Sequence, residues 1–146
     1  MKQLLLASVF FCSVTVLADF SGNWTMTGFA NGGDKNVQCE PTTVQITHTA
    51  SSLSVAPYTV KCEAMEVEYD GYELQIKNGE IWTGDTRLGT ITDSSVAVHF
   101  CGTMEDGAEA CMDMTVDKTT ETAAKWHEVW TYNGALFLEM NMEVNR

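Results

Sequence analysis

The sequence predicts an all-β protein, a single up-and-down antiparallel β-barrel of about eight to ten strands. Short runs of alternating apolar and polar residues recur roughly every ten residues, with Gly, Asn, Asp and Ser between them. No long segment repeats its apolar residues at helical spacing. The first and last runs both alternate strongly, so pairing them would close the sheet and leave no free edge.

Residues 1–18 predict a secretory signal peptide. They hold one early cation, Lys2, followed by an apolar run, and they end in a small-residue cleavage site at Ala18. The mature chain, residues 19–146, has the length of one domain and is long enough to bury a core. We therefore expect one domain in a secreted or periplasmic protein.

We expect no nucleic-acid partner and no membrane anchor. Cys12 is no candidate for lipidation, because bulky Phe11 precedes it. No later stretch approaches the ~20 apolar residues that span a bilayer. Without Lys2 the 8 basic residues fall to 7 against 20 acidic residues, so the mature chain carries a net charge of about −13. Such a surface repels nucleic acid and anionic lipid.

The strand candidates follow the alternation along the mature chain. The only two prolines, Pro41 and Pro57, fall where a bulge or an edge strand tolerates a missing backbone donor. The candidates are 21–30, 37–48, 53–61, 64–70, 72–77, 80–84, 87–92, 96–104, 110–118, 125–132 and 135–145.

One hairpin brings two cysteines together. Pairing strands 96–104 and 110–118 about Asp106 sets valine, phenylalanine and methionine side chains on one side of the sheet. The same register places Cys101 opposite Cys111. One register thus satisfies the apolar face and predicts a Cys101–Cys111 disulfide.

The other two cysteines of the mature chain pair in the same way. Folding 37–48 back on 53–62 places Cys39 opposite Cys62. An even number of cysteines in an oxidising compartment indicates disulfides, and no pair has the close spacing of a structural zinc site. We therefore predict a second disulfide, Cys39–Cys62, and no metal.

Two Asn–Gly dipeptides predict two-residue hairpin turns, because both central residues of such turns take positive φ. The first is Asn78–Gly79 and the second is Asn133–Gly134. An unbroken register from the second turn sets Glu128 opposite Glu139. It also gathers one largely aromatic face, which consists of Trp126, Glu128, Trp130, Tyr132 and Phe137.

That aromatic face is a candidate patch for a protein partner. Like charges set opposite each other destabilise a sheet unless water or a cation intervenes, which favours an outer, solvated position for the glutamates. Aromatic rings around carboxylates would also suit an organic cation. If these side chains instead line the interior, Glu128 becomes a buried acid.

Gly22-x-Trp24 on the first strand resembles the N-terminal signature of the calycins, the superfamily of lipocalins, fatty-acid-binding proteins and avidins. In that family the tryptophan packs across the closed base of the barrel, commonly under a basic side chain from the last strand or just after it. The resemblance implies that Trp24 and Arg146 form the barrel base. It also implies a cavity that holds a small apolar molecule.

Assigning the apolar side of each strand to the interior yields candidate ligand contacts. Methionine is common among them, and its flexible, polarizable side chain suits a pocket that adapts to its ligand. The alternative is a barrel filled by these side chains, and sequence alone does not decide between the two. The candidates are Met65, Tyr69, Leu74, Phe100, Met112, Met114, Leu138 and Met140.

Neither a cofactor nor catalysis is expected. The Met-x-Met pairs that start at Met112 and Met140 resemble Cu(I) ligand pairs, but apolar core residues explain them better. His48, His99 and His127 lie on separate strands, without a nucleophile motif or a phosphate loop. We expect a lipocalin-like binding protein for a small apolar or amphipathic ligand. The alternative is a protein-interaction module, an inhibitor or a surface-binding protein, that uses the aromatic face.

Overall fold

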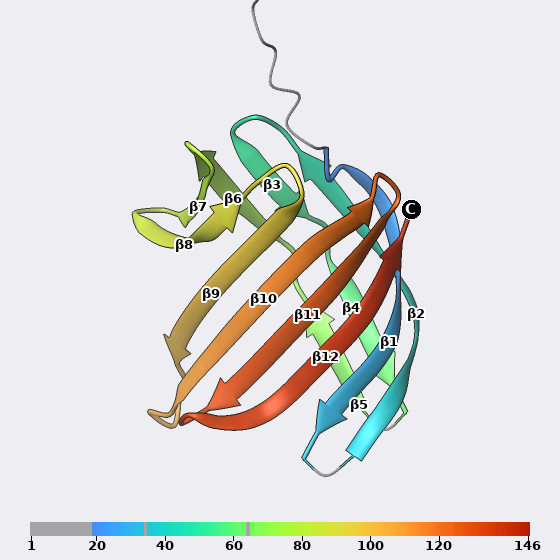
Figure 1. The fold of residues 1–146 in the computed structure, drawn as a ribbon. Helices are drawn as coiled ribbons and strands as arrows, with labels where there is room; N and C mark the ends of the chain where they lie inside the picture. The colour runs from blue at the N-terminus through green and yellow to red at the C-terminus, as the bar shows by residue number, and fades with distance from the viewer. Residues whose placement is uncertain (1–18, 34, 64) are drawn as a thin grey trace, which may run out of the picture.

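The computed structural model describes residues 19–33, 35–63 and 65–146, so the predicted signal peptide lies outside the described residues. The described chain forms one antiparallel sheet of twelve strands (Figure 1). They are β1 (Gly22–Gly32), β2 (Lys35–His48), β3 (Ser52–Val55), β4 (Tyr58–Cys62), β5 (Met65–Tyr69), β6 (Tyr72–Lys77), β7 (Glu80–Thr83), β8 (Thr86–Ile91), β9 (Ser95–Thr103), β10 (Glu109–Thr120), β11 (Ala123–Tyr132) and β12 (Ala135–Asn145).

Ten of these strands close into a barrel. Around the ring the order is β1, β12, β11, β10, β9, β8, β7, β6, β3 and β2, and β2 pairs back with β1. The first strand therefore pairs with the last, with Thr25 opposite Asn145, as the alternation predicted. The β4–β5 hairpin extends the sheet beyond β2, which leaves β5 as an edge strand.

Both predicted disulfides are present. Cys101 pairs with Cys111 across β9 and β10, in the register expected from the apolar face. Cys39 and Cys62 are bonded across β2 and β4. The two bonds therefore join strand neighbours on opposite sides of the ring.

The predicted strand 53–61 divides into two. β3 ends at Val55 and pairs with β6, whereas β4 begins at Tyr58 and pairs with β5. Pro57 lies in the break, where it has no N–H to give to a ladder. Gly71 has φ of +81°, and a Cβ there would lie 2.8 Å from the nitrogen of Pro57. The close approach of these two segments fixes the break.

The register predicted for the last hairpin is wrong by one residue. The ladder shifts between Trp130 and Thr131, so that Leu138 lies opposite Trp130 while Leu136 lies opposite Thr131. Phe137 is the extra residue of this β-bulge. A shift of one residue moves a strand's side chains to the other face. Glu128 therefore lies opposite Met140 and not opposite Glu139.

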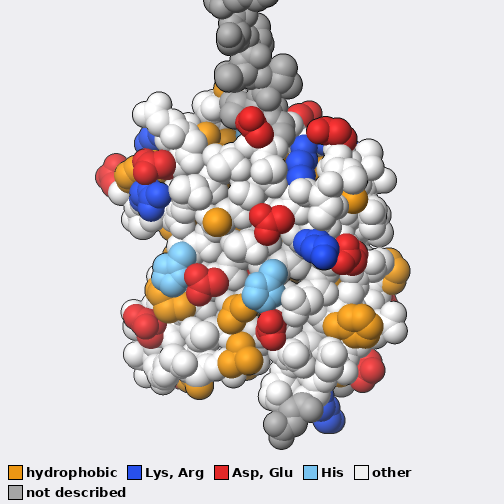
Figure 2. All heavy atoms as spheres, viewed as in Figure 1, with side chains coloured by type: hydrophobic (Ala, Val, Ile, Leu, Met, Phe, Trp, Pro, Cys, Tyr) orange, Lys and Arg blue, Asp and Glu red, His pale blue; other side chains and the backbone are white. Residues whose placement is uncertain are grey.

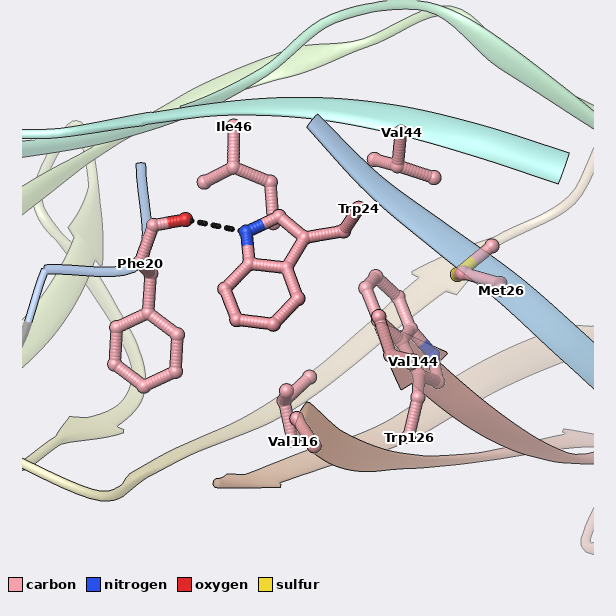
Figure 3. Close-up of a pocket in the computed structure, with 9 residues that line it drawn as sticks. Phe20, Trp24, Met26, Val44, Ile46, Val116, Trp126 and Val144 are labelled. Carbon is pink, nitrogen blue, oxygen red and sulfur yellow. Dashed lines mark hydrogen bonds between the residues drawn. The ribbon is translucent and has the colours of Figure 1, made fainter. Parts of the chain in front are cut away.

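The base of the barrel is closed around Trp24 (Figure 3). The indole N–H of Trp24 donates to the Phe20 carbonyl at 2.8 Å, and the Arg146 guanidinium carbon lies 4.8 Å from the ring centroid. The space left among the surrounding apolar side chains is only about 10 Å³. This end of the barrel is packed.

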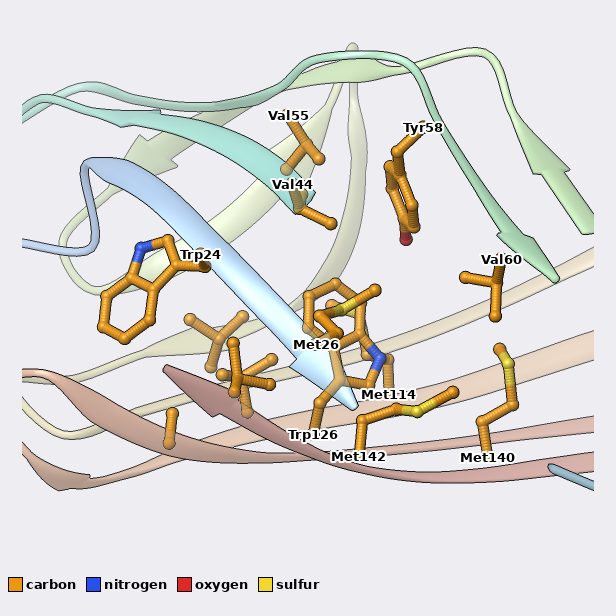
Figure 4. Close-up of a cluster of buried hydrophobic side chains, with 14 of the residues drawn as sticks. Trp24, Met26, Val44, Val55, Tyr58, Val60, Met114, Trp126, Met140 and Met142 are labelled. Atoms are coloured by element: carbon orange, nitrogen blue, oxygen red, sulfur yellow. The ribbon is translucent and has the colours of Figure 1, made fainter. Parts of the chain in front are cut away.

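The buried side chains of the two walls meet inside the ring (Figure 4). Met26, Met114, Met140 and Met142 are each at most 5% exposed. Two of the methionines predicted for the interior, Met114 and Met140, thus contribute to a packed core through the middle of the barrel. In the described part of the chain, we find no helix of the length and apolarity that a membrane span needs.

Candidate functional site

The barrel wall is incomplete beside the second half of β9. β8 pairs with β9 only from Val96 to Val98, so 99–103 has a neighbour on the β10 side alone. β5, the edge strand of the sheet, has no second partner among the described strands. The inward-pointing Phe100 of this part of β9, and in part Met112 opposite it on β10, are consequently open to solvent from the side.

An apolar cleft of about 280 Å³ lies at this incomplete wall. Met112 and Met114 contribute from β10, and Phe100 at the mouth is 45% exposed although it points to the inner side. Nearly all of the lining atoms are apolar. The lining residues are Tyr72, Leu74, Thr83, Leu88, Val98, Phe100, Met112 and Met114.

The structure brings half of the predicted ligand contacts to this cleft: Leu74, Phe100, Met112 and Met114. Leu138 and Met140 are instead buried in the core, at 3% and 2% exposure. Met65 lines a separate surface hollow of about 190 Å³ together with Lys35 and Glu63. Tyr69, the remaining candidate, contacts a buried acid.

That acid is Glu128 of β11, whose side chain is fully buried inside the barrel. Its carboxylate accepts hydrogen bonds from the Tyr69 hydroxyl at 2.6 Å and the Trp130 indole at 2.5 Å, both at Oε1. The Trp126 indole donates to Oε2 at 3.1 Å. Because indole N–H groups can only donate, this set of neighbours matches a carboxylate.

Three tyrosines surround Glu128 from the opposite wall. The Tyr58 and Tyr69 rings stack at 4.4 Å between centroids, and the Tyr58 hydroxyl points across the barrel toward β11 and β12 (Figure 4). Burial raises the pKa of Tyr58, Tyr69 and Tyr72, and the negative charge of Glu128 raises each further. The three phenols therefore stay protonated as hydrogen-bond donors at neutral pH.

One polar atom of this group lacks a partner. The Tyr58 hydroxyl is buried and makes no hydrogen bond to any described protein atom. A buried polar group without a partner is uncommon, because it loses its bonds to water and gains none. Within the barrel, the Tyr58 hydroxyl is therefore a free hydrogen-bonding position.

The predicted aromatic patch does not exist as one surface. Trp126 and Glu128 are buried and Trp130 is half-buried inside the barrel, because the bulge at Phe137 inverts the face. Only Tyr132 and Phe137 remain exposed, at 38% and 66%. Trp126, Glu128 and Trp130 thus line the interior, which is the alternative in which Glu128 is a buried acid.

On the outer face, acidic side chains lie next to histidines (Figure 2). His99 Nδ1 lies 2.7 Å from Asp113 Oδ1, and its Nε2 lies 3.3 Å from the sulfur of Cys101. His99, Cys101 and Cys111 come close enough to suit a metal, but both sulfurs are bonded to each other. A disulfide offers no thiolate ligands.

The fold and site together define a closed antiparallel β-barrel with a lateral apolar cleft and a buried acid. No protein-family model matches the chain, and no curated protein matches it either. Among solved structures, it is similar to a redesigned β-barrel bound to DFHBI, with 10% identity over 86% of this chain and 94% of that one, TM-score 0.48.

Two further structures are similar to this chain. A de novo designed fluorescence-activating β-barrel has 13% identity over 87% of this chain and 93% of that one, with a TM-score of 0.44. An S-type phycobiliprotein lyase from Guillardia theta has 11% identity over 86% of each chain, with a TM-score of 0.49. The similarities extend to β-barrel architecture alone.

Proposed function

We propose that this protein is a calycin-like binding protein that takes a small apolar or amphipathic ligand through the lateral cleft and performs no catalysis. The observation that carries the proposal is the cleft of about 280 Å³ with an almost wholly apolar lining. Its volume is close to the lower end of small-molecule pockets. The Gly22-x-Trp24 strand with Arg146 over its ring supports the calycin part, and the two disulfides fit an extracellular or periplasmic protein.

Titration with a neutral solvatochromic dye tests this function. A neutral dye avoids repulsion by the acidic surface. We expect saturable binding at one site, loss of binding in Met112→Trp, which fills the cleft, and unchanged binding in Met104→Trp. Met104 is 52% exposed and does not line the cleft, so it is a matched control. Equal dye affinity in the two variants, or no saturable binding to the unmodified protein, would contradict the proposal.

A protein partner at the last hairpin is the second candidate function. The observation in its favour is the exposure of Leu136 and Phe137, at 58% and 66%, next to Tyr132. Trp130→Ala would not test it cleanly, because Trp130 donates to the buried Glu128. Phe137→Ala is the better variant: it should abolish capture of a partner from the native extracellular fluid while the melting temperature stays unchanged.

A further inference from the structure

We propose that the ligand is a cationic amphiphile: an organic amine whose apolar body fills the cleft and whose ammonium group pairs with Glu128. This inference rests on the proposed function, since the cleft must first admit the apolar body. The two features lie side by side in the barrel. Met114, which lines the cleft, is the direct cross-strand partner of Glu128, and Met112 is the partner of Trp130.

That pairing places the carboxylate one strand away from the cleft. Directly opposed residues on one face of an antiparallel pair have Cβ atoms about 4.5–5.5 Å apart. Tyr72 lines the cleft from the other wall and lies near enough to Glu128 for its charge to act on the phenol. Glu128 therefore lies directly behind the part of the cleft that Met114 lines.

Glu128 lacks a positive partner. Among the described residues, the ion pairs join other side chains, and none involves Glu128. Its three hydrogen-bond donors are neutral. A carboxylate withdrawn from water without a countercharge is costly, and a bound cation would offset part of that cost. A carboxylate offers about four acceptor positions, so one remains for an ammonium N–H.

The aromatic side chains around Glu128 suit the same ligand. Tyr58, Tyr69 and Trp126 present ring faces and edges to this part of the interior, with Tyr58 and Trp126 6.5 Å apart between centroids. Aromatic faces attract ammonium groups, most strongly where water is excluded. The unpartnered Tyr58 hydroxyl supplies an oxygen that can accept a second ammonium N–H.

The ammonium group reaches Glu128 by rotation of the intervening methionines. Met112 and Met114 separate the cleft from the acid, and both side chains are unbranched with several rotatable bonds. Met112 is only partly buried, so its side chain has room to turn toward the open wall. The backbone ladder of β10 with β11 need not change.

A matched pair of ligands tests this inference. The probes are 2-naphthylethylamine and 2-naphthylethanol, which share one apolar body and differ in the charged head. Calorimetric titrations at neutral pH and physiological ionic strength are compared. We expect the amine to bind at least about tenfold more tightly than the alcohol, because the ammonium brings a positive charge to the carboxylate and the neutral hydroxyl does not.

Three variants locate the head group. Glu128→Gln should abolish the amine preference, whereas Glu73→Gln should keep it. Glu73 is exposed on β6 beside the cleft residues Tyr72 and Leu74, so this control removes the same charge without touching the interior. Tyr58→Phe removes only the free hydroxyl and should reduce the preference several-fold. Because no hydrogen bond is lost, Tyr58→Phe remains informative even if Glu128→Gln fails to fold.

The outcomes separate this inference from the proposed function. Equal binding of amine and alcohol would overturn the cationic ligand and leave the apolar cleft standing. Binding of neither probe, nor of the neutral dye, would overturn both. An amine preference that survives both Glu128→Gln and Tyr58→Phe would show that the ammonium binds an acid on the surface, and this too would overturn the inference.

Discussion

Glu128 is the only fully buried charged side chain among the described residues, and its neighbours show how the barrel accommodates it. Every bond that it accepts comes from an aromatic side chain with a polar tip, so apolar rings and polar atoms meet at one point. Such residues pack as hydrophobic bodies and still satisfy a buried acceptor. The interior therefore keeps its packing around a charge.

Two tyrosine variants separate a used hydroxyl from an unused one. Tyr69→Phe removes a hydrogen bond to a buried carboxylate and should lower the free energy of unfolding by about 1.5–3 kcal/mol. Tyr58→Phe removes a buried hydroxyl without a partner. It should change the free energy of unfolding by less than about 0.5 kcal/mol, or increase it. Urea unfolding curves measure both. A loss in Tyr58→Phe as large as in Tyr69→Phe would show that Tyr58 has a bond that the structure lacks.

Trp24 and Arg146 should act on stability and not on binding. Trp24→Ala empties the packed base and should cost about 3–5 kcal/mol in the free energy of unfolding. Arg146→Ala removes a cation over the ring and hydrogen bonds to the carbonyls of Asp19 and Ser21, and should cost about 1–2 kcal/mol. Dye affinity should stay unchanged in Arg146→Ala, because neither residue lines the cleft. Weaker dye binding in that variant would link the base to the site.

At the scale of elements, the alternation of residues along β11 predicts the buried face of the last hairpin better than the register counted from its Asn–Gly turn. On β11 the apolar side chains of Ala124, Trp126 and Trp130 share a parity with Glu128, while the other parity includes polar Lys125, His127 and Thr131. That pattern alone places Glu128 inside. The Asn–Gly turn predicted the opposite face, because a two-residue turn fixes the register only until a bulge intervenes. Nothing local to Phe137 marks the bulge, which follows from fitting β12 between β11 and β1.

Other registers were predictable because two constraints agreed. In β9 and β10 the apolar face and the cysteine pair require the same alignment, and the structure has it. The cleft was not predictable in this way. It arises where β8 ends its pairing with β9 at Val98, and the length of a ladder depends on how the whole ring closes. Sequence patterns indicated which side chains point inward but not where the wall opens.

The seam between β1 and β12 depends on one glycine. A Cβ at Gly28 would lie 2.1 Å from the Asn141 carbonyl oxygen, which is backbone and cannot turn aside. Gly28→Ala should therefore cost about 1–3 kcal/mol in the free energy of unfolding. Gly102→Ala on β9 is the control, since its nearest contact would be 3.5 Å away on the Phe100 ring. Chemical unfolding should show less than about 0.5 kcal/mol for the control, and equal losses would contradict this account.

The two disulfides should differ in their access to reductant. Cys101 is exposed and Cys111 half-buried, whereas Cys39 and Cys62 are 5% and 0% exposed. Thiol exchange needs a direct approach to sulfur, so the buried bond waits for local opening. Under native conditions with dithiothreitol, Cys101–Cys111 should be reduced first, as alkylation and mass spectrometry would show. Simultaneous reduction would mean that the β2–β4 contact opens freely.

At the scale of the whole molecule, the ends of the described chain meet at the barrel base. The Asp19 carbonyl accepts hydrogen bonds from Arg146 at 3.0 Å and from Lys118 at 3.1 Å. The β1–β12 seam is thus one ladder among ten, although it joins the strands most distant in sequence. If the ring is the unit that folds, the position of the chain break should matter little, provided that every ladder stays intact.

A circular permutant tests that expectation. Joining Arg146 to Asp19 with a short Gly/Ser linker and opening the chain before Gly107 cuts an exposed loop, where no atom lies within 4 Å of an added Cβ. The Cys101–Cys111 bond still holds β9 to β10 across the cut. We expect the native circular dichroism spectrum and unchanged dye affinity. A second permutant, opened between Thr115 and Val116, cuts the β10 ladders on both sides and should not fold. Failure of the first permutant would show that the covalent order of the strands matters beyond the closed ring. Folding of the second would show that the fold does not require intact β10 ladders.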